Sequence, residues 1–162
     1  MAYADRFKVT TARFANVAFS NGSLPAGFVE RVMKRQPIAA PEDVLRYFVS
    51  PEESGQICLL ACVLGRNGEV FFPKLGEEKM MRFSTIADRF LRCLGYEPRR
   101  CGSDEEAKRF AATMPEDTRE WPVVYFRSDT TGEKDFEEFF VEGESVDMAR
   151  FAALGVICES CR

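Results

Sequence analysis

Polar residues follow a strand-like run near the N-terminus and come directly before a predicted helix. Residues 7–19 are rich in β-branched and aromatic side chains, which predicts a strand, and residues 20–23 (SNGS) supply a turn and an N-cap. A helix is predicted over residues 24–35, ended by Pro37. In open α/β sheets ligands bind at the carboxyl ends of strands, and free N–H groups at a helix start favour anions. The run therefore indicates either an anion-binding turn or an ordinary strand-to-helix turn.

Within this turn the candidate anion ligands are Ser20, Ser23 and the backbone of Gly22 to Leu24. Each serine has an alternative role as a helix cap, because a hydroxyl oxygen can accept a hydrogen bond from the first turn. The sequence leaves both roles open.

Composition fits one globular domain without general affinity for nucleic acid. The chain has 162 residues, 46% of them hydrophobic and 30% charged, with a net charge of −4. Binding to a phosphate backbone usually needs a basic domain, and the sequence pI is about 5.1. Basic residues gather at residues 31–35 and 99–100, where solvated helix faces and loops are the simpler interpretation.

The chain has six cysteines and no histidine. It has no apolar stretch long enough to span a bilayer and no signal peptide, so we expect a cytoplasmic protein with reduced thiols. Cys158 and Cys161 form a CxxC pair, and Cys58 and Cys62 are four residues apart among core-type residues. Because a tetrahedral site normally needs four ligands, structural or incidental thiols are favoured over a metal site.

The remaining elements follow from caps and apolar runs. Ser50-Pro51-Glu52-Glu53 predicts a capping box that begins a helix ending at Gly65. Three extended segments are expected at 38–41, 43–49 and 69–73, the second an apolar run and the third a strand, and an edge strand is expected at 121–126. A helix capped by Ser84 and ended by Gly95 should face inward with Ile86, Phe90, Leu91, Cys93 and Leu94. Further helices are expected from Ser103 to about Met114, at 133–140 with Phe136, Phe139 and Phe140 buried, and at 147–154. These elements predict a single α/β unit over residues 1–162, without the strict alternation of a complete doubly wound sheet.

Four segments carry a resemblance to a known family. They are residues 13–28 (RFANVAFSNGSLPAGF), 43–55 (DVLRYFVSPEESG), 70–75 (VFFPKL) and 129–138 (DTTGEKDFEE). In this order they resemble extended short-chain dehydrogenase/reductases that act on nucleotide sugars. The likeness is to the polysaccharide-biosynthesis group of nucleotide-sugar 4,6-dehydratases and epimerases, whose substrates include UDP-N-acetylglucosamine.

The resemblance implies an α/β fold that is the C-terminal portion of such an enzyme, with an incomplete Rossmann-type sheet and a small mixed α/β substrate-binding region. The family needs a Gly-rich turn for NAD or NADP and a Tyr-x-x-x-Lys pair for catalysis, and this sequence has neither. We therefore expect no catalytic residue and no cofactor in this chain, with the dinucleotide-binding domain lying upstream of Met1.

The resemblance also implies substrate-binding positions. Asn16 corresponds to an asparagine beside the substrate, and Arg46 to an arginine that holds the diphosphate, where a guanidinium can bind phosphate oxygens bidentately. Lys74, Glu133 and Lys134 correspond to positions near the nucleotide, although Glu133 and Lys134 also suit a structural helix start. The expected ligand is a UDP-sugar.

Two classes of function follow. The first is a nucleotide-sugar-binding fragment that is not catalytically complete alone, and the second is a non-catalytic α/β protein-interaction domain. Without an upstream domain packed against residues 7–19, exposed apolar surface there predicts that the chain self-associates. A zinc module built on Cys158 and Cys161 is a remote third possibility.

Overall fold

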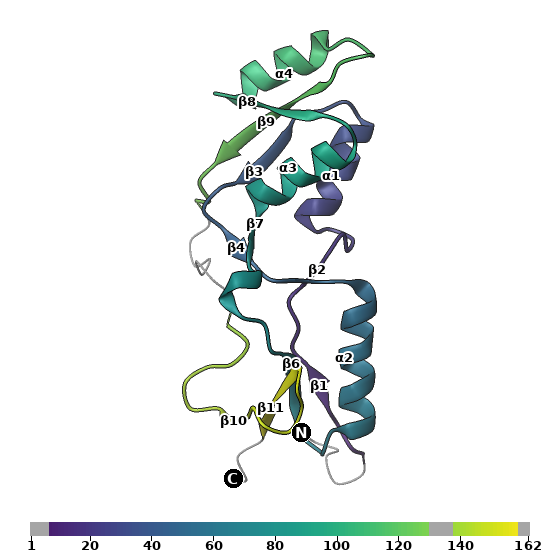
Figure 1. The fold of residues 1–162 in the computed structure, drawn as a ribbon, viewed down its shortest axis with the longest axis vertical. Coiled ribbons are helices and arrows are strands. Elements are labelled where there is room, and N and C mark those ends of the chain that lie inside the picture. The colour runs from purple at the N-terminus through teal and green to yellow at the C-terminus, as the bar shows by residue number, and fades with distance from the viewer. Residues whose placement is uncertain (1–6, 130–137, 159–162) are drawn as a thin grey trace. The chain divides into compact units, whose positions relative to one another are not determined.

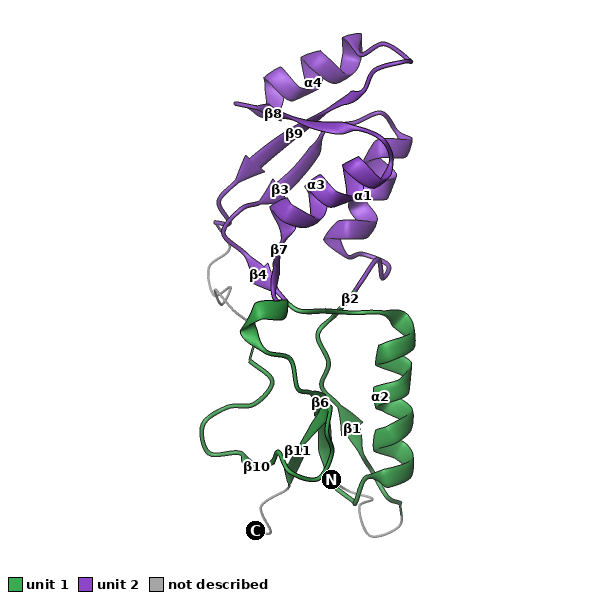
Figure 2. Cartoon of the chain, in the orientation of Figure 1, with its two compact units in different colours: residues 1–17, 47–79, 137–162 green, residues 18–46, 80–136 purple. Residues whose placement is uncertain are grey.

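The computed structural model describes residues 7–129 and 138–158 of the chain, a mixed α/β fold with several small sheets and four α-helices in this part. Its residues group into two compact units (Figure 2). Unit 1 comprises residues 1–17, 47–79 and 137–162, and unit 2 comprises residues 18–46 and 80–136. The chain contributes three segments to unit 1 and two segments to unit 2. The single α/β substrate-binding unit over residues 1–162 remains a prediction.

Unit 1 contains a four-stranded sheet covered by one helix (Figure 1). The strand order is β1 (Thr11–Ala12), β6 (Val70–Pro73), β11 (Leu154–Cys158) and β10 (Ser145–Asp147), and β1 is parallel to β6 while the other pairs are antiparallel. Helix α2 (Pro51–Leu64) packs on β1 and β6, and a separate parallel pair joins β2 (Asn16–Val17) to β5 (Phe48–Val49). The core consists of Ile57, Ala61, Phe71, Leu154 and Val156.

Helix α2 begins and ends as its sequence predicts. The Ser50 hydroxyl accepts from the Glu53 N–H at 3.1 Å, and the Glu53 carboxylate accepts from the Ser50 N–H at 2.7 Å, which completes the capping box. Gly65 follows the last turn with a negative φ of −73°. A Cβ on Gly65 would lie 2.4 Å from the Ala61 carbonyl oxygen and 2.6 Å from Thr10 Cγ2, so close packing requires the glycine.

Unit 2 is built on a three-stranded parallel sheet, with strands in the order β3 (Ile38–Pro41), β9 (Glu120–Phe126) and β8 (Glu97–Cys101). Helices α1 (Leu24–Met33) and α3 (Phe83–Cys93) lie on one face and α4 (Asp104–Thr113) on the other (Figure 1). A second pair joins β4 (Leu45–Arg46) to β7 (Met81–Arg82), and a 3₁₀ turn in unit 1 spans Glu77–Lys79. The core consists of Phe28, Ile38, Ala40, Ala87, Leu91, Met114, Trp121 and Val123.

The strand predicted at 7–19 is wrong in extent. The structure has two short strands there, Thr11–Ala12 and Asn16–Val17, which pair with β6 and β5 respectively. Aromatic and β-branched composition identified the extended region, but the change of partner between the two strands depends on residues far along the chain. The helix predicted over 24–35 ends at Met33, two residues early, and Arg35 adopts a positive φ of 52° before Pro37.

Two predictions about α3 are also wrong. The helix begins at Phe83, so Ser84 lies within its first turn, and the N-cap Arg82 makes no side-chain capping bond. Cys93 and Leu94 are exposed, whereas Ala87 and Leu91 are buried. Gly95 ends the helix with φ of +86°, as predicted.

Strand β9 is central rather than an edge strand, because β3 and β8 flank it. Pro122 favoured an edge position, since proline cannot donate to a ladder. Its place explains the exception: the pairing with β3 begins only at Val123, so Pro122 lies in the part of β9 with one neighbouring strand. Strand β8, the partner on that side, was not predicted.

The helix predicted at 147–154 is wrong, because this segment connects the antiparallel strands β10 and β11. The Asp147 carboxylate accepts from the Ala149 N–H at 2.9 Å and the Arg150 N–H at 3.1 Å, which is an Asx-type turn rather than a helix cap. Most of the helix predicted at 133–140 lies outside the described residues. Of its described residues, Glu138 to Phe140 are not helical, Phe139 is buried and Phe140 is exposed.

Candidate functional site

The turn before α1 is held by its own hydrogen bonds. The Ser23 hydroxyl accepts from the Ala26 N–H at 3.3 Å, and the Ser23 N–H donates to the Ser20 carbonyl at 2.9 Å. Gly22 has φ of +80°, a conformation that favours glycine. Ser23 is therefore the helix cap, which was one of the two roles that the sequence left open for it.

Few N–H groups remain at this helix start for a ligand. Pro25 carries no N–H, the Ala26 N–H bonds the Ser23 hydroxyl, and the Gly27 N–H bonds the Ser23 carbonyl at 3.1 Å. Among the described residues, the Leu24 N–H is thus the first-turn donor with no hydrogen bond. An anion here would meet one backbone donor and the helix dipole.

Asn16 lies in unit 1, on β2, with its side chain turned to the neighbouring strand region. Its backbone N–H and its Nδ2 both donate to the Tyr47 carbonyl oxygen, at 3.2 and 3.3 Å. Tyr47 is buried, with its ring centroid 5.4 Å from that of Phe139. The carboxamide orientation is consequently fixed by a buried neighbour.

Arg46 lies in unit 2, half-buried on the short strand β4 opposite Met81. Its Nη1 donates to the Leu45 carbonyl at 2.8 Å. A guanidinium is a planar fork of five N–H donors, a geometry that suits phosphate oxygens.

Lys74 lies in unit 1 just after β6, and its ammonium group holds the connection between β10 and β11. The Nζ atom donates to the carbonyl oxygens of Met148 and Phe151. These two hydrogen bonds give Lys74 a structural role within unit 1, which is sufficient to explain a lysine at this position.

The predicted site residues thus fall into three sets. Asn16 and Lys74 belong to unit 1, Ser20 to Leu24 and Arg46 belong to unit 2, and Glu133 and Lys134 lie outside the described residues. The proposed binding roles of these residues remain predictions.

A polar cluster that the sequence did not predict lies at the carboxyl ends of the parallel strands of unit 2. Arg100 Nη2 forms a 3.0 Å ion pair with Glu42, and the guanidinium carbon lies 5.0 Å from the ring centroid of Tyr125. The Tyr125 hydroxyl donates to Asp88, and burial, followed by the Asp88 carboxylate, raises the pKa of Tyr125. Tyr125 is therefore a protonated hydrogen-bond donor at neutral pH.

A second unpredicted cluster joins Glu69 and Arg150 in unit 1. Both Glu69 carboxylate oxygens lie 2.9 Å from Arg150 Nη1, and Glu69 also accepts from the Arg66 N–H at 2.7 Å. Arg150 Nη2 donates to the Leu64 carbonyl at 2.5 Å, at the end of α2. No local pattern signals this pair, because its members are 81 residues apart.

Within residues 7–129 and 138–158, no three His, Cys, Asp or Glu side chains converge as metal ligands. Cys58 and Cys62 are exposed on α2, although the sequence placed them among core-type residues, and Cys161 lies outside the described residues. None of the helices in this part of the chain is both long enough and apolar enough to cross a bilayer.

Comparison with known proteins relates this fold to a longer protein. The structure is similar to the X-ray structure of Pen from Bacillus thuringiensis, with a TM-score of 0.64 and 18% sequence identity over 93% of this chain. The chain spans 39% of the length of that Pen chain. A comparison with curated proteins finds no match. Residues 2–158 match the model of the family described as polysaccharide biosynthesis protein, and the chain belongs to that family.

Proposed function

We propose that this chain is the nucleotide-sugar-binding part of an NAD(P)-dependent nucleotide-sugar 4,6-dehydratase or epimerase of surface polysaccharide biosynthesis. The observation that carries the proposal is the family match over residues 2–158, which covers all four segments that resemble this enzyme group. The fold corresponds to the C-terminal portion of an extended short-chain dehydrogenase/reductase, and a UDP-sugar such as UDP-N-acetylglucosamine is the ligand.

The local geometry supports a division of roles among the predicted residues. A guanidinium such as that of Arg46 can bind two diphosphate oxygens at once, whereas the helix start at Leu24 offers one backbone N–H and its dipole. Asn16 presents a carboxamide whose orientation is fixed by Tyr47. Arg46 should therefore contribute more affinity for the diphosphate than Ser20 or Ser23.

The chain alone is not a complete catalyst under this proposal. Its sequence contains no Tyr-x-x-x-Lys pair, and Tyr125, the half-buried tyrosine bonded to Asp88, is followed four residues later by Asp129. NAD or NADP and the proton-transfer residues would belong to a dinucleotide-binding domain of the longer enzyme. The 39% coverage of Pen leaves room for such a domain.

Calorimetric titration of the chain with UDP-N-acetylglucosamine tests the binding claim. We expect weak, saturable binding that Arg46→Lys reduces about tenfold, because lysine cannot make the bidentate phosphate contact. Arg109→Lys on the exposed surface of α4 is the matched control and should bind like the parent chain. Absence of saturable binding, or equal affinity in the two variants, would refute the proposed site.

One observation favours the alternative of a protein-interaction domain. Helix α2 of unit 1 exposes Leu59, Leu60, Val63 and Leu64 to solvent. Exposed apolar surface of this kind marks contact with another chain or domain. Self-association of the isolated chain is compatible with both functions.

A further inference from the structure

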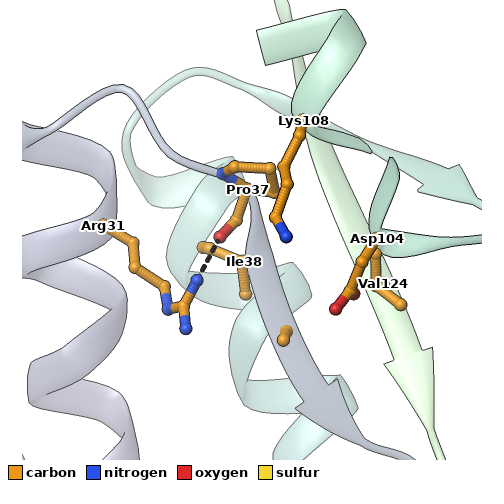
Figure 3. Close-up of a pocket in the computed structure, with 7 residues that line it drawn as sticks. Arg31, Pro37, Ile38, Asp104, Lys108 and Val124 are labelled. Atoms are coloured by element: carbon orange, nitrogen blue, oxygen red, sulfur yellow. Dashed lines mark hydrogen bonds between the residues drawn. The ribbon is translucent and has the colours of Figure 1, made fainter. Parts of the chain in front are cut away.

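Unit 2 contains a small cavity at the start of the edge strand β3 (Figure 3). Its volume is about 170 Å³, room for several water molecules. The floor is apolar, formed by Pro37 and Ala39 of the β3 region and by Val124 of β9. Helix α4 covers β8 and β9, so the cavity lies beside α4, where β3 has no helix over this face.

The walls of the cavity carry charged side chains from two helices. Arg31 of α1 enters from one side, and Asp104 and Lys108 of α4 enter from the other (Figure 3). Arg31 Nη1 donates to the Pro37 carbonyl at 3.1 Å, which fixes the guanidinium beside the start of β3. The remaining Arg31 donors have no partner among the described residues.

Lys108 and Asp104 are also without partners. They are one helical turn apart, a spacing that permits an ion pair, yet neither side chain makes an ion pair or hydrogen bond with any described residue. The cavity therefore presents two cations, one carboxylate and an apolar floor, with a net charge of +1. This arrangement favours an anion that also carries a hydrogen-bond donor.

We propose that the cavity binds a small phosphate monoester whose carbon chain bears a hydroxyl group. The phosphate would lie between Arg31 and Lys108, whose charge-assisted hydrogen bonds are stronger than neutral ones. The hydroxyl would donate to Asp104, and the carbon chain would contact Pro37, Ala39 and Val124. A phosphate monoester is favoured over a carboxylate because it carries about −1.5 to −2 charges at pH 7, enough to outweigh repulsion by Asp104.

This cavity is separate from the nucleotide-sugar residues of the proposed function. Ser23 and Arg31 are eight residues apart along α1, about 12 Å along the helix axis. The cavity lies at the amino end of β3 and beside the start of α4, which follows the carboxyl end of β8. The phosphate monoester is thus a second ligand, and this inference holds whether or not the chain binds a UDP-sugar.

Titration of the full chain with sn-glycerol 3-phosphate, followed by calorimetry or by amide shifts of Ala39 and Val124, tests the proposal. Inorganic phosphate and glycerol are the reference ligands. We expect saturable binding of glycerol 3-phosphate, weaker binding of phosphate and none of glycerol. Lys108→Gln should weaken glycerol 3-phosphate binding at least tenfold, whereas Lys34→Gln, an exposed α1 lysine paired with Glu30, should not change it.

Asp104→Asn tests the recognition of the hydroxyl group separately from the recognition of the phosphate. Removing the carboxylate should strengthen phosphate binding and reduce the preference for glycerol 3-phosphate over phosphate. Equal melting temperatures of the variants would show that each is folded. Lack of saturation at millimolar ligand, equal effects of Lys108→Gln and Lys34→Gln, or a ligand preference unchanged by Asp104→Asn would overturn the proposal.

Discussion

At the scale of single residues, the Glu69–Arg150 pair is the contact whose loss should cost most in unit 1. Glu69 is 6% exposed, and Arg150 connects its carboxylate to the end of α2. Among the described residues, Arg150→Met would leave the buried Glu69 carboxylate with the Arg66 N–H as its one remaining partner. Breaking a buried pair typically costs 3–5 kcal/mol, and because Arg150 is partly exposed we expect about 3 kcal/mol in the free energy of unfolding by urea.

The exposed Lys34–Glu30 pair provides the comparison for this prediction. Its side chains are 63% and 69% exposed, so Lys34→Met should change the free energy of unfolding by less than about 1 kcal/mol. A similar small effect from Arg150→Met would mean that water replaces the guanidinium at Glu69.

Glu144 should make the stability of unit 1 sensitive to acid. Its hydrogen bond from Arg13, and then that from the Val141 N–H, lower the pKa of the Glu144 carboxyl in the folded chain. A lowered folded pKa stabilises the fold above the ordinary glutamate pKa, and this stabilisation is lost as the pH falls through the folded value. Urea unfolding of Glu144→Gln across this acidic range should show a shallower loss of stability than the parent chain.

Because Glu144 is partly exposed and the Arg13 side chain is 42% exposed, the effect should shrink at high salt. Glu142→Gln, two residues away, is the matched control and should leave the acid dependence unchanged. If both variants follow the pH profile of the parent chain, the Arg13 contact does not persist in solution.

At the scale of elements, helix α2 depends on its N-terminal capping box. Ser50→Ala removes the hydroxyl that accepts from the Glu53 N–H and should lower the free energy of unfolding by about 1 kcal/mol. Ser54→Ala is the matched control, since Ser54 lies inside the same helix and its hydroxyl donates to the Pro51 carbonyl at 2.8 Å. Urea unfolding should show a near-neutral effect for Ser54→Ala, and equal effects of the two variants would contradict a capping role.

The sequence predicted the starts of α1, α2 and α4 and the end of α3, because the signals for these helix ends are local. The caps Ser23, Ser50 and Ser103 each accept from an N–H three residues later, and Gly95 has the positive φ expected after a helix. Strand partners were harder to predict because they are distant in sequence. Propensity alone could not show that β9 has β8 on one side and β3 on the other.

In the candidate site too, roles that depend on nearby residues could be predicted, whereas roles that depend on distant residues could not. The capping role of Ser23 was among the alternatives read from the sequence, since its partner is three residues away. The two carbonyls that bind Lys74 lie 74 and 77 residues further along the chain, so no local pattern could reveal them. The cavity beside α4 needs residues from α1, β3, β9 and α4, and of its charged residues the sequence pointed to Arg31 alone, as part of a solvated helix face.

At the scale of the whole molecule, helix α2 carries apolar residues both on the face that packs on the sheet of unit 1 and on faces that are exposed to solvent. Ile57 and Ala61 face the sheet, whereas Leu59 and Val63 are each 64% exposed. Helices that are apolar all round are normally buried. A second copy of this chain is one candidate to cover this surface, and a partner chain or domain is another.

We expect the isolated chain to self-associate through this exposed α2 surface, because apolar area left in water favours association. Size-exclusion chromatography with light scattering should show a mass that increases with protein concentration. The double variant Leu59→Lys, Val63→Lys should shift the chain toward monomer, because two charges would have to be desolvated at the contact. Met33→Lys on α1, a site that is 80% exposed, is the matched control and should associate like the parent chain. A parent chain that stays monomeric at high concentration, or a double variant that associates as strongly as the control, would show that α2 forms no interface between copies of this chain.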